Sequence, residues 1–163
     1  MKNKLLYLIR HAKAEEYSFA KRDHDRNIVD TGRMRSLQIA DNLAGIFNLT
    51  QNTLVISSTA NRAIQTAELF CNKLHYPIPY IQQEKSIYEA HYLDILRVIN
   101  QVPNTADTLL IFGHNPGLSD LTNYLTDSPI DLKTSHVAII ELESGLDFAA
   151  LSGSTATLKG ILI

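Results

Sequence analysis

Two histidines and two arginines follow apolar runs of the chain, and their types suit chemistry on a negatively charged group. Arg10-His11 ends one apolar run, His114 comes just after another, and Arg62 lies shortly beyond a third. A neutral imidazole is a good nucleophile, and a guanidinium group binds an oxyanion through parallel hydrogen bonds. No carboxylate stands beside these residues in the sequence to neutralise their charge. The set predicts a pocket for an oxyanion, with a phosphoryl group as the first candidate.

Taken singly, each of these residues has an ordinary structural explanation. A lone histidine after a strand is more often a hydrogen-bonded loop residue than a catalyst. A lone arginine at a helix start is usually solvated. The prediction therefore depends on all four residues reaching one place, which only the fold can arrange.

Short apolar runs alternate with segments of helical period along the chain. Buried strands are expected at 5–9, 54–56 and 109–112, and an edge strand at 77–81, where two prolines interrupt the run. Later segments indicate a hairpin of 137–142 with 146–151 around Ser144-Gly145, and a last strand at 156–163. Apolar residues at helical spacing predict helices over 34–47, with Thr31 as N-cap, and over 61–74, 93–102 and 118–125.

This alternation predicts an α/β fold, in which a mostly parallel sheet is covered by helices on both faces as a three-layer α/β/α sandwich. Some antiparallel strands are expected late in the chain. Ligands of such sheets bind beyond the carboxyl ends of the strands. The histidines and arginines named above are expected to meet at that edge.

Length and composition set further limits. The 163 residues, 45% of them hydrophobic, fit one domain over 1–163. Cys71 is the only cysteine, so disulfides do not form the scaffold. The net charge of −2 gives no reason to expect nucleic acid or an anionic membrane as a partner. The apolar run at 5–9 is shorter than the roughly 7 to 15 residues of a signal peptide core, so a cytoplasmic protein is expected. The protein is also expected to be a monomer.

The same residues lie in ordered segments that resemble the histidine phosphatase superfamily, and within it the small SixA-type phosphohistidine phosphatases. Five segments spread over much of the chain are a specific signal, whereas an isolated Arg-His pair is not. The matching stretches are 8–15 (LIRHAKAE), Asp25-Arg26 with Thr31-Gly32, Ser57-Ser58 with Arg62-Ala63 and Gln65-Thr66-Ala67, 87–90 (IYEA) and 113–118 (GHNPGL).

The resemblance implies a phosphoglycerate-mutase-like fold and a role for each matching residue. His11 would be the nucleophile that becomes a phosphohistidine intermediate. Arg10, Arg62 and His114 would hold the phosphoryl oxygens, and Glu89 would give a proton to the leaving group. These types suit the reaction, because phosphoryl transfer mainly needs positioning and positive charge. No cofactor and no metal are required.

Asn115 and Glu89 are expected to complete the predicted site. Asn115 precedes a helix, and its backbone N–H is expected to point at the phosphate. Glu89 is the favoured proton donor, but other titratable residues lie in segments that can reach the pocket: Glu15, Asp23, Asp25, Glu84 and His91.

Longer branches of the superfamily carry insertions that cap the pocket, and this chain has little room for them. An uncapped pocket admits a phosphorylated side chain, so phosphohistidine on a partner protein is the expected substrate. Small phosphoesters are the alternative, because Glu89 helps an alkoxide leaving group most.

Two other classes stay open. His11, His114, His91 and Glu89 could ligate a metal in a metallohydrolase, although the common metal-ligand spacings are missing. A non-catalytic phosphate-binding relative is the second, although neither a Gly-x-Gly-x-x-Gly nor a Walker A pattern occurs.

Overall fold

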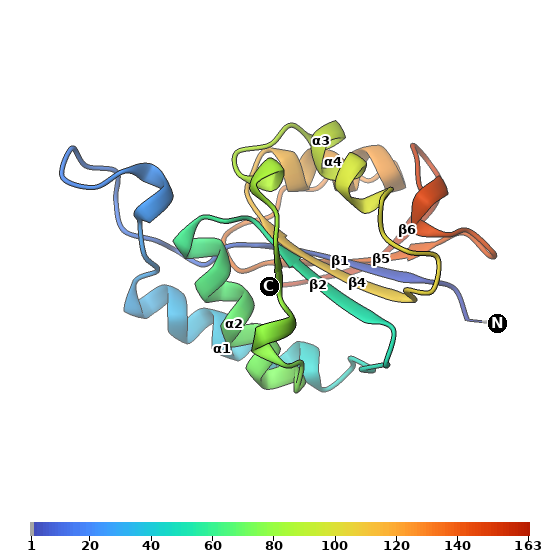
Figure 1. Cartoon of the computed structure of the whole chain (residues 1–163), viewed down its shortest axis with the longest axis horizontal. Coiled ribbons are helices and arrows are strands. Elements are labelled where there is room, and N and C mark those ends of the chain that lie inside the picture. Colours follow the sequence, from blue (N-terminus) through green and yellow to red (C-terminus); the bar gives the residue numbers. More distant parts are fainter. Residues whose placement is uncertain (1) are drawn as a thin grey trace.

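The computed structural model describes residues 2–163 and contains one six-stranded sheet (Figure 1). Its strands lie in the order β3-β2-β4-β1-β5-β6. Strands β3, β2, β4 and β1 are parallel, and β5 is antiparallel to both β1 and β6. This confirms the mostly parallel sheet with antiparallel strands late in the chain. The bounds are β1 (Leu5–Arg10), β2 (Thr53–Ser57), β3 (Gln82–Gln83), β4 (Thr108–Gly113), β5 (Val137–Leu142) and β6 (Ala156–Leu162).

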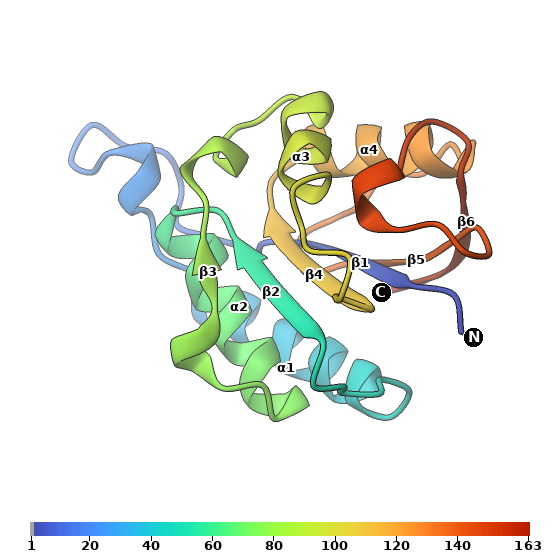
Figure 2. The same ribbon diagram turned by 45° about the vertical axis from the view of Figure 1, so that its right-hand side comes forward.

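Helices cover both faces of this sheet, which confirms the three-layer prediction (Figures 1 and 2). On one side lie α1 (Asp30–Ala44) and α2 (Asn61–Leu74), and on the other α3 (Tyr92–Ile99) and α4 (Gly117–Thr126). Successive side chains of a strand point to opposite faces. In β1, Leu6 and Leu8 accordingly join the core under α3 and α4, while Tyr7 and Ile9 join the core over α1 and α2.

The first helix differs from its prediction in both its start and its buried face. The helix begins at Asp30 with Val29 as N-cap, so Thr31 is not the cap. Met34 is 66% exposed rather than buried. The buried face includes Gly32, where a Cβ would come within 2.4 Å of the Lys13 carbonyl oxygen. Ala40 and Leu43 are buried as expected. Small residues let the backbones approach at Gly32, so hydrophobic spacing alone did not find the whole buried face.

Two later segments also differ from expectation. The segment 146–151 forms no strand; it contains a short 3-10 helix, Phe148–Ala150, and β6 pairs with β5 in its place. Phe148 is fully buried in the core on the α3 and α4 side. The apolar residue in this segment therefore packs in the core and does not indicate a paired strand. The region 77–81 contains another 3-10 helix, Ile78–Tyr80, because proline has no N–H to give to a sheet. The edge strand β3 follows it.

Within residues 2–163, the helices are all too short or too polar to cross a membrane.

Candidate active site

The carboxyl ends of β1 and β4 bring two distant segments of the chain side by side. Arg10 lies opposite Gly113 in the parallel register, and the His11 N–H donates to the Gly113 carbonyl at 3.0 Å. The imidazole rings of His11 and His114 consequently have centroids 5.2 Å apart. The structure thus brings together both histidines at the sheet edge, where the sequence placed them.

His11 is held in one orientation and one protonation state. Its ring is 9% exposed, and Nδ1 lies 2.8 Å from the carbonyl oxygen of Ala12. A carbonyl only accepts, so Nδ1 carries the proton and Nε2 keeps a lone pair. Burial lowers the pKa of His11 to about 4, and the charges of Arg62 and Arg10 add to the effect. At neutral pH His11 is a neutral imidazole with a free nitrogen, which is the form a nucleophile needs.

Arg62 lies in the first turn of α2 and is only 1% exposed. It donates from Nη1 to the Asp23 carbonyl at 2.8 Å, and from Nη2 to Asp23 Oδ2 at 3.1 Å and Glu89 Oε1 at 2.9 Å. Its Nε has no hydrogen-bond partner. Carboxylates therefore do neutralise this arginine, and the sequence did not reveal them because they come from distant segments.

Asp23 binds Arg62 and is itself bound by Tyr88. Asp23 opens the short 3-10 helix Asp23–Asp25 and pairs with Arg26 at 2.8 Å, and it accepts a hydrogen bond from the Tyr88 hydroxyl. Burial alone would raise the pKa of Asp23, but the Tyr88 hydrogen bond and the arginines outweigh it and lower the value to about 2. Asp23 is thus ionised at neutral pH and orients Arg62, so it is a poor proton donor.

Neither residue was assigned a role from the sequence, although Asp23 was noted as able to reach the pocket. The available signal was the opposite charge of Asp23 and Arg26 three positions apart. The sequence gives no comparable signal at Tyr88. Burial and the hydrogen bond to Asp23 raise the pKa of Tyr88 to about 12.

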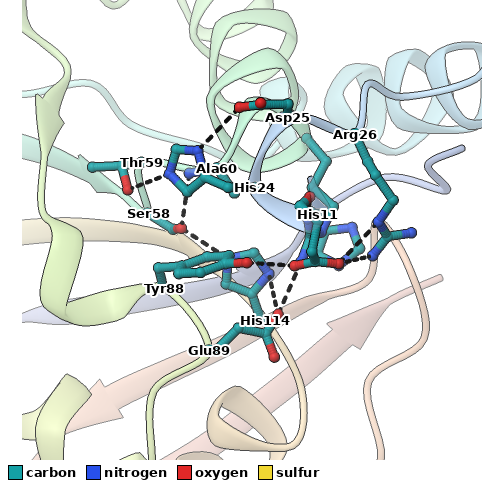
Figure 3. Close-up of polar contacts among 12 residues, drawn as sticks. His11, His24, Asp25, Arg26, Ser58, Thr59, Ala60, Tyr88, Glu89 and His114 are labelled. Carbon is teal, nitrogen blue, oxygen red and sulfur yellow. Dashed lines mark hydrogen bonds and ion pairs between the residues drawn. The ribbon is translucent and has the colours of Figure 1, made fainter. Parts of the chain in front are cut away.

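His114 has one ring nitrogen directed at Glu89 and the other directed at Ser58 (Figure 3). The residue is 3% exposed, and its Nε2 lies 2.8 Å from the Ser58 hydroxyl. Nδ1 is buried without a hydrogen bond and lies 3.9 Å from Glu89 Oε1. Burial, with the proximity of His11 and Arg62, lowers the pKa of His114 to about 3. His114 is therefore also neutral, and can donate to a ligand only through a protonated Nδ1.

Arg10 and Asn115 meet at a shared loop. Nη1 of Arg10 donates to the Leu132 carbonyl at 3.1 Å, while its Nε is buried and unpartnered. The Asn115 amide donates to the same carbonyl at 2.6 Å, and its oxygen accepts from the Ser119 hydroxyl at 2.8 Å. The Asn115 side chain is thus occupied in holding the loop. The role expected for its backbone N–H stays a prediction.

Glu89 lies at the rim, with its side chain 53% exposed and its backbone at a φ of 51°. It contacts Arg62 and approaches His114, as described above. The other candidate donors have different partners: Glu15 binds Lys21, Asp25 binds Arg22, Glu84 binds Ser86 and His91 caps α3. Of the acids weighed from the sequence, Glu89 is accordingly the one beside both His114 and Arg62.

No three His, Cys, Asp or Glu side chains within residues 2–163 converge as metal ligands. His91, one member of the alternative metal set, instead accepts a hydrogen bond from the Leu93 N–H at 3.3 Å. Its ring packs against that of Tyr92, with centroids 4.5 Å apart.

The fold and the site define a phosphoglycerate-mutase-like histidine phosphatase. The chain belongs to the histidine phosphatase superfamily (branch 1), whose family model matches residues 6–101. By class it is a phosphatase enzyme.

Known proteins similar to the chain include an uncharacterized relative and solved structures of the same fold. An uncharacterized chloroplastic protein of Arabidopsis thaliana is 28% identical over 159 residues, which cover 91% of this chain and 72% of the relative. A solved structure named as a candidate phosphohistidine phosphatase SixA, from Agrobacterium tumefaciens, has a TM-score of 0.80 at 23% identity, covering 100% of this chain and 99% of that one. The protein histidine phosphatase SixA complexed with tungstate has a TM-score of 0.78 at 20% identity, covering 97% and 96%.

Proposed function

We propose that this chain is a metal-independent phosphatase that forms a phosphohistidine on His11 and removes phosphate from phosphohistidine on a partner protein. The observation that carries the proposal is the state of His11. Its Nδ1–H donates a hydrogen bond to the Ala12 carbonyl, so Nε2 presents a lone pair near Arg10, Arg62 and His114.

In the first step, the lone pair of His11 Nε2 attacks phosphorus. A P–N bond forms while the bond from phosphorus to the leaving nitrogen or oxygen breaks, and that atom takes the bonding electrons. Glu89 in its acid form gives the leaving atom a proton. Arg10, Arg62 and His114 hold the equatorial oxygens, on which negative charge is spread. Because Arg62 Nη2 contacts Glu89 before substrate arrives, the incoming phosphoryl group takes over part of that contact.

In the second step, a water oxygen attacks phosphorus and the P–Nε2 bond breaks. The Glu89 carboxylate, left ionised by the first step, accepts the proton of the water. Inorganic phosphate leaves, and His11 returns to the neutral tautomer that its bond to Ala12 favours. Atoms and charge balance without any further reactant.

Access to the site supports a protein-borne substrate. The chain passes from Glu89 directly into α3, and from His114 directly into α4, with no inserted domain over the histidines. The half-exposed Glu89 marks an open rim. Three of the similar solved structures carry SixA names, and one of these three holds tungstate, an oxyanion of phosphate-like shape.

Hydrolysis of small phosphoesters is the second candidate, and Glu89 is the observation that favours it. Imidazole departs readily once protonated and can take its proton from solvent. An alkoxide depends on a positioned acid. The position of Glu89 beside His114 and Arg62 therefore suits ester substrates as well.

The deciding experiment compares kcat/KM on a phosphohistidine protein, a phosphoserine peptide and p-nitrophenyl phosphate with one preparation of the enzyme. The proposal expects the phosphohistidine protein to have the highest value. A higher value for the phosphoserine peptide would move the assignment to ester substrates. Trapping an acid-labile phosphoenzyme tests the covalent step separately, and its absence in a turning-over sample would exclude that step.

A further inference from the structure

Ser58 lies next to the catalytic histidines but carries no role so far. It follows β2 directly, is fully buried, and its Oγ is 2.8 Å from His114 Nε2 (Figure 3). The Ala60 N–H donates to the same oxygen at 3.2 Å. The Ser58 hydroxyl proton thus has one acceptor among the hydrogen bonds of this region, namely His114 Nε2.

Two arrangements of protons are open to a neutral His114. If Nε2 carries the proton, it donates to Ser58, whose own proton is then buried without an acceptor. In that case Nδ1 also turns a lone pair toward Glu89 Oε1, 3.9 Å away. If Nδ1 carries the proton, Ser58 donates to Nε2, and every donor at Ser58 is satisfied. Buried polar groups are overwhelmingly hydrogen-bonded, so the second arrangement is favoured.

From these contacts we infer that Ser58 is a positioning residue, whose hydroxyl donates to His114 Nε2 and so directs the Nδ1 proton of His114 at the phosphoryl oxygen. This deepens the proposed function and rests on it for the identity of the ligand. Because burial keeps the pKa of His114 at about 3, the ring brings no positive charge to the phosphoryl group at neutral pH. Its contribution then depends on which nitrogen holds the single proton. With the other tautomer, His114 would place a lone pair against an anionic oxygen.

The orphaned Nδ1 supports the same conclusion. Within residues 2–163 it is one of three buried side-chain nitrogens without a hydrogen bond, and the other two are the Nε atoms of Arg10 and Arg62. All three belong to the residues expected to hold the phosphoryl group. Unpaired buried donors are costly, and they are retained where a ligand completes them.

The direct test is the tautomer of His114 in the wild-type protein, read from long-range proton–nitrogen NMR spectra of 15N-labelled protein at pH 7. The His114 signals are assigned by their loss in His114→Ala. The expected result is a protonated Nδ1 and an unprotonated Nε2. A protonated Nε2 in the wild type would overturn the inference. This measurement needs no substrate, so it stands even if the proposed function fails.

The kinetic test uses Ser58→Ala, with Ser57→Ala as the matched control. Ser57 is equally buried, but its hydroxyl donates to the Ser58 carbonyl at 2.9 Å and not to His114. Ser58→Ala should shift the His114 tautomer and lower kcat/KM on p-nitrophenyl phosphate by roughly 10- to 100-fold. That is less than the roughly 10²- to 10³-fold loss for removing a charge-stabilising donor itself. Ser57→Ala should leave the tautomer unchanged.

A double-mutant cycle separates positioning from a general structural effect. In a His114→Ala background, Ser58→Ala should change kcat/KM by less than about twofold, because Ser58 acts through His114. If the full loss persisted in that background, Ser58 would act by another route and the inference would be wrong. If Ser58→Ala does not fold, the wild-type spectrum decides the question alone.

Discussion

Ala12, whose carbonyl oxygen lies 2.8 Å from His11 Nδ1, is bonded through its own N–H to the neighbouring helix. The Ala12 N–H donates to Thr66 Oγ1 at 2.9 Å, and that hydroxyl donates to the Arg62 carbonyl at 2.7 Å. The backbone that orients the nucleophile is therefore linked to the turn of α2 that carries the buried arginine. Orientation of His11 and placement of Arg62 are parts of one local structure.

Replacing His11 by Ala should abolish turnover of p-nitrophenyl phosphate and the acid-labile phosphoenzyme. The variant should fold, because His11 follows β1 at the sheet edge and its backbone bond to Gly113 is kept. Far-UV circular dichroism and thermal unfolding check the fold. His75→Asn is the control, since His75 is an exposed histidine at the opposite end of α2, in the left-handed conformation that Asn tolerates. Activity of His11→Ala above a few per cent of wild type would exclude the covalent mechanism.

Arg10, Arg62 and His114 form the proposed phosphoryl clamp, and removal of any one of them should weaken transition-state binding. Arg10→Ala and His114→Ala should each raise the activation free energy by on the order of 3 kcal/mol, read from kcat/KM. Arg62→Ala should cost at least as much, and should also lower the free energy of unfolding, because Asp23 and Glu89 lose a buried partner. Vanadate should compete with substrate, and should bind each variant more weakly. A crystal with vanadate bound away from these three side chains would contradict the assignment.

The convergence of His11 and the clamp residues could be predicted in part from the sequence, because three of the four stand at or just after strand ends. Arg10, His11 and His114 follow strands whose continuous apolar runs identify them, and the rule for parallel sheets brings those ends to one edge. Arg62 follows in the same way from β2. The two residues that complete the site, Asp23 and Tyr88, could not be found from strand ends in this way. Asp23 stands in one short 3-10 helix and Tyr88 directly after another. Segments this short have no periodicity that indicates which way a side chain points.

The elements of the fold likewise divide into those that the sequence predicts and those that it does not. Strands and helices with an unbroken apolar period, such as α2 at Asn61–Leu74, were predicted well. The errors fall where another force governs local structure. At α1 the contact of Gly32 with Lys13 sets the helix face, and at 146–151 the burial of Phe148 replaces strand pairing.

Acidification should destabilise the protein between pH 6.5 and about 4. The pKa values of His11 and His114 fall from 6.5 to about 4 and about 3 on folding. In this range the unfolded chain binds protons that the folded chain does not, so the free energy of unfolding rises with pH. The stabilisation is fully present above pH 6.5 and is lost as the pH falls toward the folded values. Each histidine contributes roughly 1.4 kcal/mol per pH unit inside the window.

Urea unfolding at pH 7 and pH 5 measures this dependence. His11→Ala and His114→Ala should each show a shallower pH dependence than wild type. Asp23 contributes little between pH 7 and pH 5, because its pKa falls from 3.8 to about 2 on folding. Equal slopes in all three proteins would show that neither histidine is held neutral by burial.

The leaving group tests whether Glu89 is the proton donor. Glu89→Gln keeps the size of the side chain and its contact with Arg62 but removes the transferable proton. Loss of a positioned acid costs roughly 10² to 10⁴ in rate on a substrate that needs it, so an alkyl phosphate should be affected most. p-Nitrophenyl phosphate should be affected least, because its leaving group departs well without a proton. A phosphohistidine substrate should fall between them, since imidazole can take its proton from solvent at an open rim.

Glu84→Gln is the matched control for this series. Glu84 is exposed and accepts from the Ser86 hydroxyl at 3.1 Å, so its carboxylate lies apart from the clamp. It should behave as wild type on all three substrates. A uniform loss for Glu89→Gln would instead place Glu89 in binding or in holding Arg62, because a role in positioning does not depend on the basicity of the leaving group. Graded losses that follow that basicity can arise only if proton transfer from Glu89 contributes to the rate.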